Sequence, residues 1–187
     1  MVDLLDPDPA TIVVDDIAHA LAMLCRFAGS VCRFWSVADH ALLCRELVCE
    51  AGEPELALAA LHHDSHEALI GDITTPVAQL LDRGALCQVR RRLDEAIGTA
   101  LGIDPDLFAH PVVVEADRAA VHLEARALQQ SRGRALLTPP PLRRVAARSV
   151  ISDGPRLAKR RFLAAHRRHT KASLCAPGQP RLGHTIP

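Results

Sequence analysis

Residues 57–77 read ALAALHHDSHEALIGDITTPV and constrain the fold more than any other stretch of the chain. The Ala- and Leu-rich first half favours a helix, because both residues have high helix propensity. Pro54, just upstream, stands at a position that is favoured in a first helical turn. Gly71 interrupts the pattern, so we expect a helix from Pro54 to about Ile70, followed by a loop or short helix. The polar His and Asp side chains inside this apolar pattern make the stretch a candidate functional site.

Gly and Pro residues divide the remaining chain into further helical patterns. Ser36, with Asp39 three residues later, resembles a capping box at a helix N-terminus. Residues 85–101 give the clearest amphipathic pattern, with apolar side chains on one face. The helices expected outside the opening stretch cover residues 11–27, 36–50, 85–101, 111–130 and 155–169. We therefore predict an all-α fold, with a compact helical bundle in residues 1–130. Residues 131–187 form a basic Pro/Arg-rich C-terminal extension, partly ordered, that holds the last helix.

A net charge of zero hides an asymmetry between these two parts. Residues 1–130 contain 9 Lys and Arg against 21 Asp and Glu, whereas residues 131–187 contain 13 against one. A basic tail on an acidic body indicates docking of the tail on the body, contact with a neighbouring subunit, or contact with polyanions. The tail has no recognisable nucleic-acid-binding module, so we do not expect specific nucleic-acid recognition.

The six cysteines include no C-x-x-C pair. In a chain of this size that composition favours reduced, mostly buried thiols rather than a disulfide framework. The N-terminal MVDLLDPDPA is acidic, unlike a secretory signal, and no apolar run is long enough to cross a bilayer. We expect a cytoplasmic protein without membrane contact.

Four residues of the types that bind metals fall on three predicted helices: His40, His63 with Asp64, and Asp117. Each has an ordinary structural alternative: His40 as a hydrogen-bonded core residue, His63-Asp64 as a helix cap, and Asp117 as an ion-pair partner of a nearby Arg. Together they would place several charged groups on faces that are otherwise apolar, which is costly unless a cation compensates them. Two His and two Asp suit one divalent transition metal, which could be Mn²⁺, Fe²⁺, Co²⁺, Ni²⁺ or Zn²⁺.

Three segments carry a resemblance to a known family: RFAGSVCRFWSVADH (26–40), ALAALHHDSHEALIGDITTPV (57–77) and VVEADRAAVHLEARAL (113–128). In order and spacing they resemble the compact HD-domain metal-dependent phosphohydrolases, in particular the bacterial 5′-deoxynucleotidases and the phage dATP triphosphohydrolases. The likeness covers about residues 10–130, with a weaker echo at 155–166. It implies an HD-type helical bundle with one metal held by the four residues above.

The resemblance also suggests further roles. Glu67, one turn after His63-Asp64, and Asp72, after the Gly71 break, would handle the attacking water and proton transfer. The structural alternatives are a solvated helix face for Glu67 and an N-cap for Asp72. Residues near these motifs are the proposed substrate contacts: Arg26, Phe27, Trp35 and His66. The structural alternative for Trp35 is an indole that anchors its loop to the core, and for His66 it is a surface imidazole.

The chain departs from that family at two phosphate-binding lysines, whose places are taken by Ala78 and Val114. An Arg, such as Arg26, could supply the missing charge. We expect a 5′-nucleotidase-type reaction on deoxynucleotides, in which a water activated by the metal attacks phosphorus. The alternatives are a dNTP triphosphohydrolase that releases tripolyphosphate, a non-catalytic nucleotide- or nucleic-acid-binding protein with a structural metal, and a two-iron oxygenase, which would need additional ligands. The resembled proteins assemble as oligomers, so we expect at least a homodimer.

Overall fold

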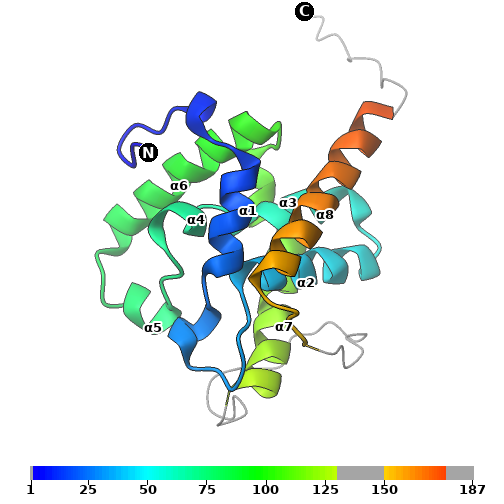
Figure 1. The fold of residues 1–187 in the computed structure, drawn as a ribbon. Helices are drawn as coiled ribbons and strands as arrows, with labels where there is room; N and C mark the ends of the chain where they lie inside the picture. The colour runs from blue at the N-terminus through cyan, green and yellow to red at the C-terminus, as the bar shows by residue number, and fades with distance from the viewer. Residues whose placement is uncertain (1, 130–149, 176–187) are drawn as a thin grey trace, which may run out of the picture.

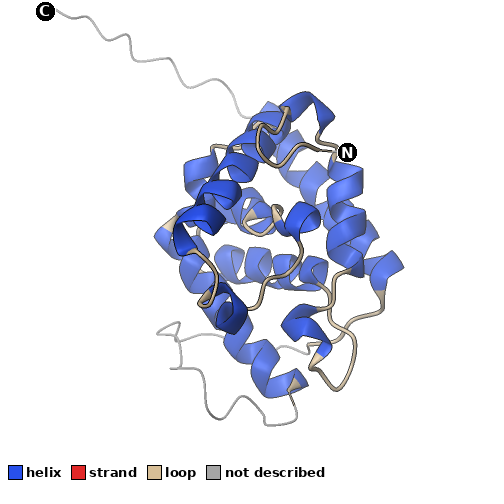
Figure 2. Ribbon diagram, turned by 90° about the vertical axis from the view of Figure 1, so that its left-hand side faces the viewer, coloured by secondary structure: helices blue, strands red, loops and turns tan. Residues whose placement is uncertain are grey.

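The computed structural model describes residues 2–129 and 150–175, and this part of the chain is helical (Figures 1 and 2). The α-helices are α1 (Val14–Met23), α2 (Val37–Glu50), α3 (Ala57–His62), α4 (Glu67–Ile70), α5 (Thr75–Ala78), α6 (Arg83–Leu101), α7 (Pro111–Leu128) and α8 (Pro155–Cys175). Single 3₁₀ turns cover Pro9–Thr11, Arg26–Gly29, Pro54–Leu56 and Pro105–Ala109. Within the described ranges the only β pairing is an isolated bridge between Cys25 and Ser36. The predicted all-α class is confirmed.

Helix α2 is the centre of the bundle. Its N-terminus carries the predicted capping box, in which Ser36 and Asp39 exchange side-chain and backbone hydrogen bonds. Because α2 packs against α1, α3, α7 and α8, most of it is buried. Two apolar clusters meet on it: one around Leu47 toward α7, the other around Ala38 toward α1, α6 and α8. The polar residues Asp39 and His40 of this helix therefore lie inside the protein.

The predicted C-terminal helix exists and belongs to the same core. Helix α8 lies beside α1 in Figure 1 and also packs on α2 and α3. Its Phe162 is fully buried and Ala158 nearly so, in one apolar cluster with Leu21 of α1. Lys159 of α8 also pairs with Asp15 of α1 at 2.6 Å. Most of the remaining extension, including the Pro139–Pro141 run, lies outside the described residues.

Two predicted helices are shorter than expected. The first covers Val14–Met23 instead of residues 11–27, because the backbone is already extended at Val13 and again at Leu24. The helix expected from Pro54 to Ile70 is divided by a turn at residues 63–66, where the backbone N–H of Ser65 bonds to the carbonyl of His62 at 2.9 Å. This i→i+3 bond is tighter than an α-helical one. His63 and Asp64 therefore lie in a turn between α3 and α4 instead of within one continuous helix.

The expectation of mostly buried thiols is wrong for the described cysteines. Cys44 is buried, Cys25 and Cys49 are half-buried, and Cys32 and Cys87 are exposed. All five are free. None of the described helices combines the length and apolar character that a membrane span requires.

Candidate metal centre

The structure brings His40, His63, Asp64 and Asp117 together, from α2, the 63–66 turn and α7. His40 Nε2 lies 3.1 Å from Asp117 Oδ1 and 3.5 Å from Asp64 Oδ2. His63 Nε2 lies 3.2 Å from Asp64 Oδ2 and 3.9 Å from Asp117 Oδ1. Ligand atoms about 2.1 Å from one ion would stand roughly 3.0–3.5 Å apart along the edges of its coordination shell. Three of the four distances fall in this range and the 3.9 Å distance between His63 and Asp117 is longer, so the four side chains form a cluster that could hold one ion.

Both imidazoles present Nε2 to this cluster because Nδ1 is engaged on the other side of the ring. His63 Nδ1 lies 2.8 Å from the carbonyl oxygen of Ala60. A carbonyl can only accept, so Nδ1 carries the hydrogen and donates it. His40 Nδ1 lies 2.8 Å from Glu124 Oε1 and donates in the same way. In its neutral form, a ring with hydrogen on Nδ1 has its lone pair on Nε2, as metal ligation requires.

The cluster also fits a cation by its unsatisfied atoms and its charge. Buried His63 Nε2 has no hydrogen-bond partner, although Asp64 is near it. Burial lowers the pKa of His63, but the adjacent Asp64, Cys44 and Asp117 more than reverse this and raise it to about 10. The same negative potential that favours a proton on the imidazole favours a divalent cation. His40 is fully buried, whereas the Asp117 side chain is 36 % exposed, so the carboxylate side of the cluster stays open to solvent.

Cys44 is a fifth ligand-type residue, which the sequence interpretation missed. Its Sγ lies 3.4 Å from His40 Nε2. The ligand atoms of Cys44, His40, His63 and Asp117 all lie within 4.8 Å of one another. Cys44 is one helical turn after His40 on α2, and this i, i+4 spacing is the sequence signal that could have identified it.

Arg26 reaches the site from the turn after α1. Its Nη1 lies 3.8 Å from Asp64 Oδ2, and its Nε donates to Glu124 Oε2 at 3.0 Å. Burial works against the charged form, but Glu124, Asp64, Asp117 and Asp72 together raise the pKa of Arg26 above its ordinary value. Arg26 is thus a permanent positive charge at the edge of the cluster.

The turn that holds Arg26 is conformationally strained. Phe27 (φ 56°) and Ala28 (φ 50°) both occupy the left-handed region, which costs about 1–2 kcal/mol for each non-glycine residue. The bond from Arg26 N–H to the Trp35 carbonyl (2.9 Å) and the adjacent Cys25–Ser36 bridge hold it there. The guanidinium of Arg26 stands 5.5 Å from the Phe27 ring centre. Strain held in this way is common at functional sites.

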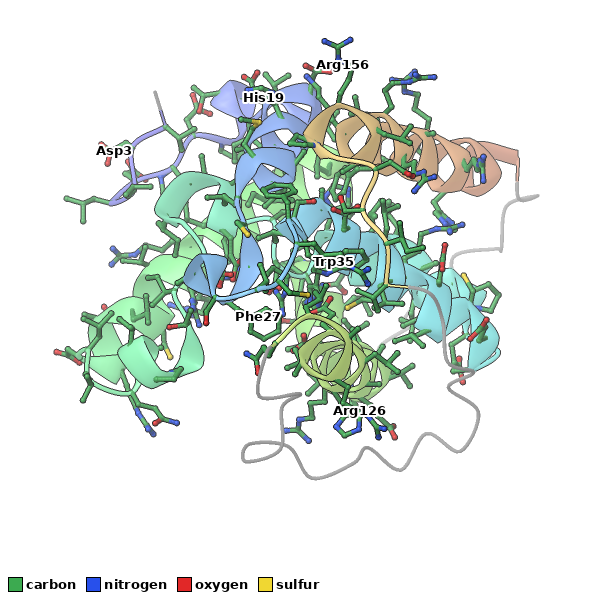
Figure 3. All side chains as sticks on the ribbon, turned by 60° about the horizontal axis from the view of Figure 1, so that its bottom comes forward. Asp3, His19, Phe27, Trp35, Arg126 and Arg156 are labelled. Carbon is green, nitrogen blue, oxygen red and sulfur yellow. The ribbon has the colours of Figure 1, made fainter. Side chains whose placement is uncertain are left out.

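Trp35 is 5 % exposed, and its indole N–H donates to Glu124 Oε1 at 2.9 Å. Figure 3 shows it inside the bundle, whereas Arg126 and Arg156 lie at the outer surface. An indole with so little free surface has no open face on which a nucleobase could stack. The structure therefore favours the anchoring interpretation of Trp35 over a substrate contact.

Glu67 and Asp72 lie beside the cluster at the two ends of α4. Glu67 is 6 % exposed, and its Oε2 has no hydrogen-bond partner. Burial, and then the charges of Asp64 and Asp72, raise the pKa of Glu67 to about 8. Gly71, with φ 83°, ends α4 and turns the chain so that Asp72 follows. Burial also raises the pKa of Asp72, with Arg26 opposing it. Two carboxyl groups that hold protons unusually strongly suit acid–base chemistry.

His66 and His62 are both buried, and each has a defined partner. His66 Nδ1 lies 3.0 Å from Asp94 Oδ1 on α6, so His66 is not the surface imidazole of the structural alternative. A ligand-type atom of His66 nonetheless lies within 4.8 Å of those of Asp64 and Glu67. His62 joins the hydroxyl of Ser65 to the ring of a histidine on α8, at 2.9 and 3.0 Å. His62 therefore links α8 to the turn that carries the candidate ligands.

Comparison with known proteins finds relatives without an assigned activity. No family model matches the chain. An uncharacterized protein of Rhodobacter capsulatus is 38 % identical over 132 residues, which cover 66 % of each chain. The uncharacterized protein YfdR of Escherichia coli is 40 % identical over 94 residues, covering 50 % of this chain and 49 % of YfdR. The chain thus spans less than two thirds of either relative.

Proposed function

We propose that this protein is an HD-type metal-dependent phosphohydrolase that removes phosphate from deoxynucleotides. One observation carries the proposal. Ligand atoms of His40, His63, Asp64 and Asp117 converge, with 3.1–3.9 Å between His nitrogens and Asp oxygens, and beside them Glu67 has a buried carboxyl oxygen without a hydrogen-bond partner. The ligand set suits one Mn²⁺, Fe²⁺, Co²⁺, Ni²⁺ or Zn²⁺ ion.

A divalent cation at this site would polarise a phosphoryl oxygen and make water more acidic. The remaining tasks fall to this chain's own side chains. Glu67 Oε2 is available to accept a hydrogen bond from the attacking water and take its proton. Asp72, whose pKa is raised by burial, can hold a proton for the leaving ester oxygen. Water and a phosphate monoester then yield a nucleoside and phosphate.

The charge near the cluster supports a monophosphate substrate over a triphosphate. Among the described residues, Arg26 is the only Lys or Arg that forms an ion pair with a cluster carboxylate. At the positions of the two family lysines, Ala78 and Val114 carry no charge. A single guanidinium can grip one phosphate in a bidentate manner, whereas a triphosphate brings several negative charges that need more cations.

Exposed apolar side chains support self-association. Val77, Leu80 and Leu81, in and just after α5, are 49 %, 87 % and 44 % exposed. Adjacent exposed apolar residues of this kind are typical of protein contact surfaces. We therefore propose at least a homodimer, which light scattering coupled to size-exclusion chromatography would test.

The decisive experiment is a hydrolysis screen. Purified protein with added Mn²⁺, Co²⁺ or Zn²⁺ is incubated with each dNMP and dNTP, and Asp64→Ala serves as the control. Orthophosphate from a dNMP that requires Asp64 supports the proposal, whereas tripolyphosphate from a dNTP would instead support the triphosphohydrolase. Tight nucleotide binding without any product would mean a non-catalytic binding protein.

A further inference from the structure

Glu124, on α7, is a buried carboxylate whose position in the site no motif predicted. It is fully buried, and its two oxygens receive three side-chain donors. Oε1 accepts from His40 Nδ1 at 2.8 Å and from Trp35 Nε1 at 2.9 Å, while Oε2 accepts from Arg26 Nε at 3.0 Å. We propose that Glu124 is a positioning residue that aims His40 Nε2 at the metal and Arg26 at the substrate phosphate.

The placement of Glu124 follows from the helix that carries Asp117. The two residues are seven apart, which is two turns and puts them on the same face of α7. One helix therefore supplies both a candidate ligand and the group behind another ligand, His40. This arrangement keeps Asp117 and His40 in register, because α7 and α2 are packed together.

A carboxylate is the side chain that these three donors require. All three present N–H groups, so each needs an acceptor. The two oxygens of Glu124 accept all three, from His40 at 2.8 Å, Trp35 at 2.9 Å and Arg26 at 3.0 Å. An apolar residue of similar size would leave three buried donors unsatisfied, which is destabilising.

Glutamine separates the positioning role from a packing role, because it keeps the shape and removes one acceptor. If its oxygen faces His40 and Trp35, its NH₂ opposes the N–H of Arg26. If it turns over, the NH₂ opposes His40 Nδ1–H and favours the tautomer with hydrogen on Nε2, which cannot ligate a metal through Nε2. Either orientation disturbs one of the two groups that Glu124 serves, while the core volume is unchanged.

The part of the inference that concerns Arg26 and the substrate phosphate rests on the proposed function. The part that concerns His40 and the metal can be tested without any turnover. Co²⁺ is titrated into metal-free wild type and Glu124→Gln, and its visible absorption reports binding. We expect affinity to fall about 10–100-fold, the usual effect of losing a partner behind a metal-ligating His. Glu115→Gln, on the same helix, is the matched control and should bind Co²⁺ like wild type. Equal affinity in Glu124→Gln and wild type would overturn the inference.

Trp35→Phe distinguishes positioning from packing, since it removes one donor to Glu124 and leaves the His40 and Arg26 bonds in place. We expect nearly wild-type Co²⁺ affinity, and a loss as large as that of Glu124→Gln would attribute the effect to packing and overturn the inference. If Glu124→Gln does not fold, nitrogen-15 NMR of zinc-loaded wild type decides. A His40 ring protonated at Nδ1 supports the role of Glu124, and one deprotonated there refutes it.

If dNMP hydrolysis is detected, Glu124→Gln should also raise KM through Arg26. If no nucleotide is hydrolysed, the proposed function fails while the Co²⁺ result still stands, so the two failures are distinguishable.

Discussion

Acid should weaken the protein through His62, the buried imidazole that joins α8 to the turn after α3. Its ring is fully buried, bonded to Ser65 and His166, and in edge contact with Phe162. Burial first, and then the nearby His166 and His63, lower the pKa of His62 to about 3. The unfolded chain, with the ordinary value of 6.5, takes up this proton first as the pH falls. The contribution of His62 to stability is therefore lost progressively below pH 6.5.

The size of the effect follows from the shift. One pKa unit corresponds to about 1.36 kcal/mol, so at pH 5, about 1.5 units below the unfolded value, His62 costs about 2 kcal/mol of folding free energy. His40 and His63 act in the opposite sense in the metal-free protein, because their folded pKa values are raised. Their contribution is complete below pH 6.5 and is lost as the pH rises above it. The difference in unfolding free energy between His62→Gln and wild type isolates the contribution of His62, because His40 and His63 are present in both proteins.

The assay is urea unfolding of metal-free wild type and His62→Gln at pH 7.5 and pH 5. We expect the variant to be less stable at pH 7.5, because it loses the packing against Phe162, and the gap to narrow by about 2 kcal/mol at pH 5. His19→Gln, at an exposed position on α1, is the control and should keep the same gap at both values. A gap for His62→Gln that does not change with pH would refute the argument.

Three further outcomes can be checked directly. Phe162→Ala should cost about 3–5 kcal/mol in urea unfolding, because it empties a fully buried site that joins α8 to α1; a small cost would mean that α8 is not part of the core in solution. Glu67→Gln should lower kcat for dNMP hydrolysis by about 10²–10⁴-fold while Co²⁺ affinity is kept; loss of Co²⁺ binding would instead make Glu67 a ligand. Prolonged dialysis against a chelator should abolish hydrolysis, with Mn²⁺ or Co²⁺ restoring it, and full activity in protein shown to be metal-free would contradict the assigned centre.

Local signals were enough to predict much of this molecule. The Ser36–Asp39 capping box begins α2 as expected, and Gly102, in a left-handed conformation, ends α6 at the predicted position. Such features depend on a few neighbouring residues, so they can be read from the chain directly. The four ligand-type residues were also identifiable, because charged groups on apolar helix faces require compensation.

Contacts between distant segments could not be predicted in the same way. Glu124 lies 84 residues from His40 and 98 from Arg26, and as an isolated residue it looks like any acidic residue on a helix. His62, which precedes the turn at residues 63–66, bonds to a histidine of α8 that lies 104 residues away. The amino-acid sequence by itself determined the helical class, several helix ends such as Ser36 and Gly102, and the residue types available for metal chemistry. The tertiary structure decided which nitrogen of each imidazole faces the cluster and which carboxylates lie behind it, because those choices depend on hydrogen bonds between helices that only packing brings together.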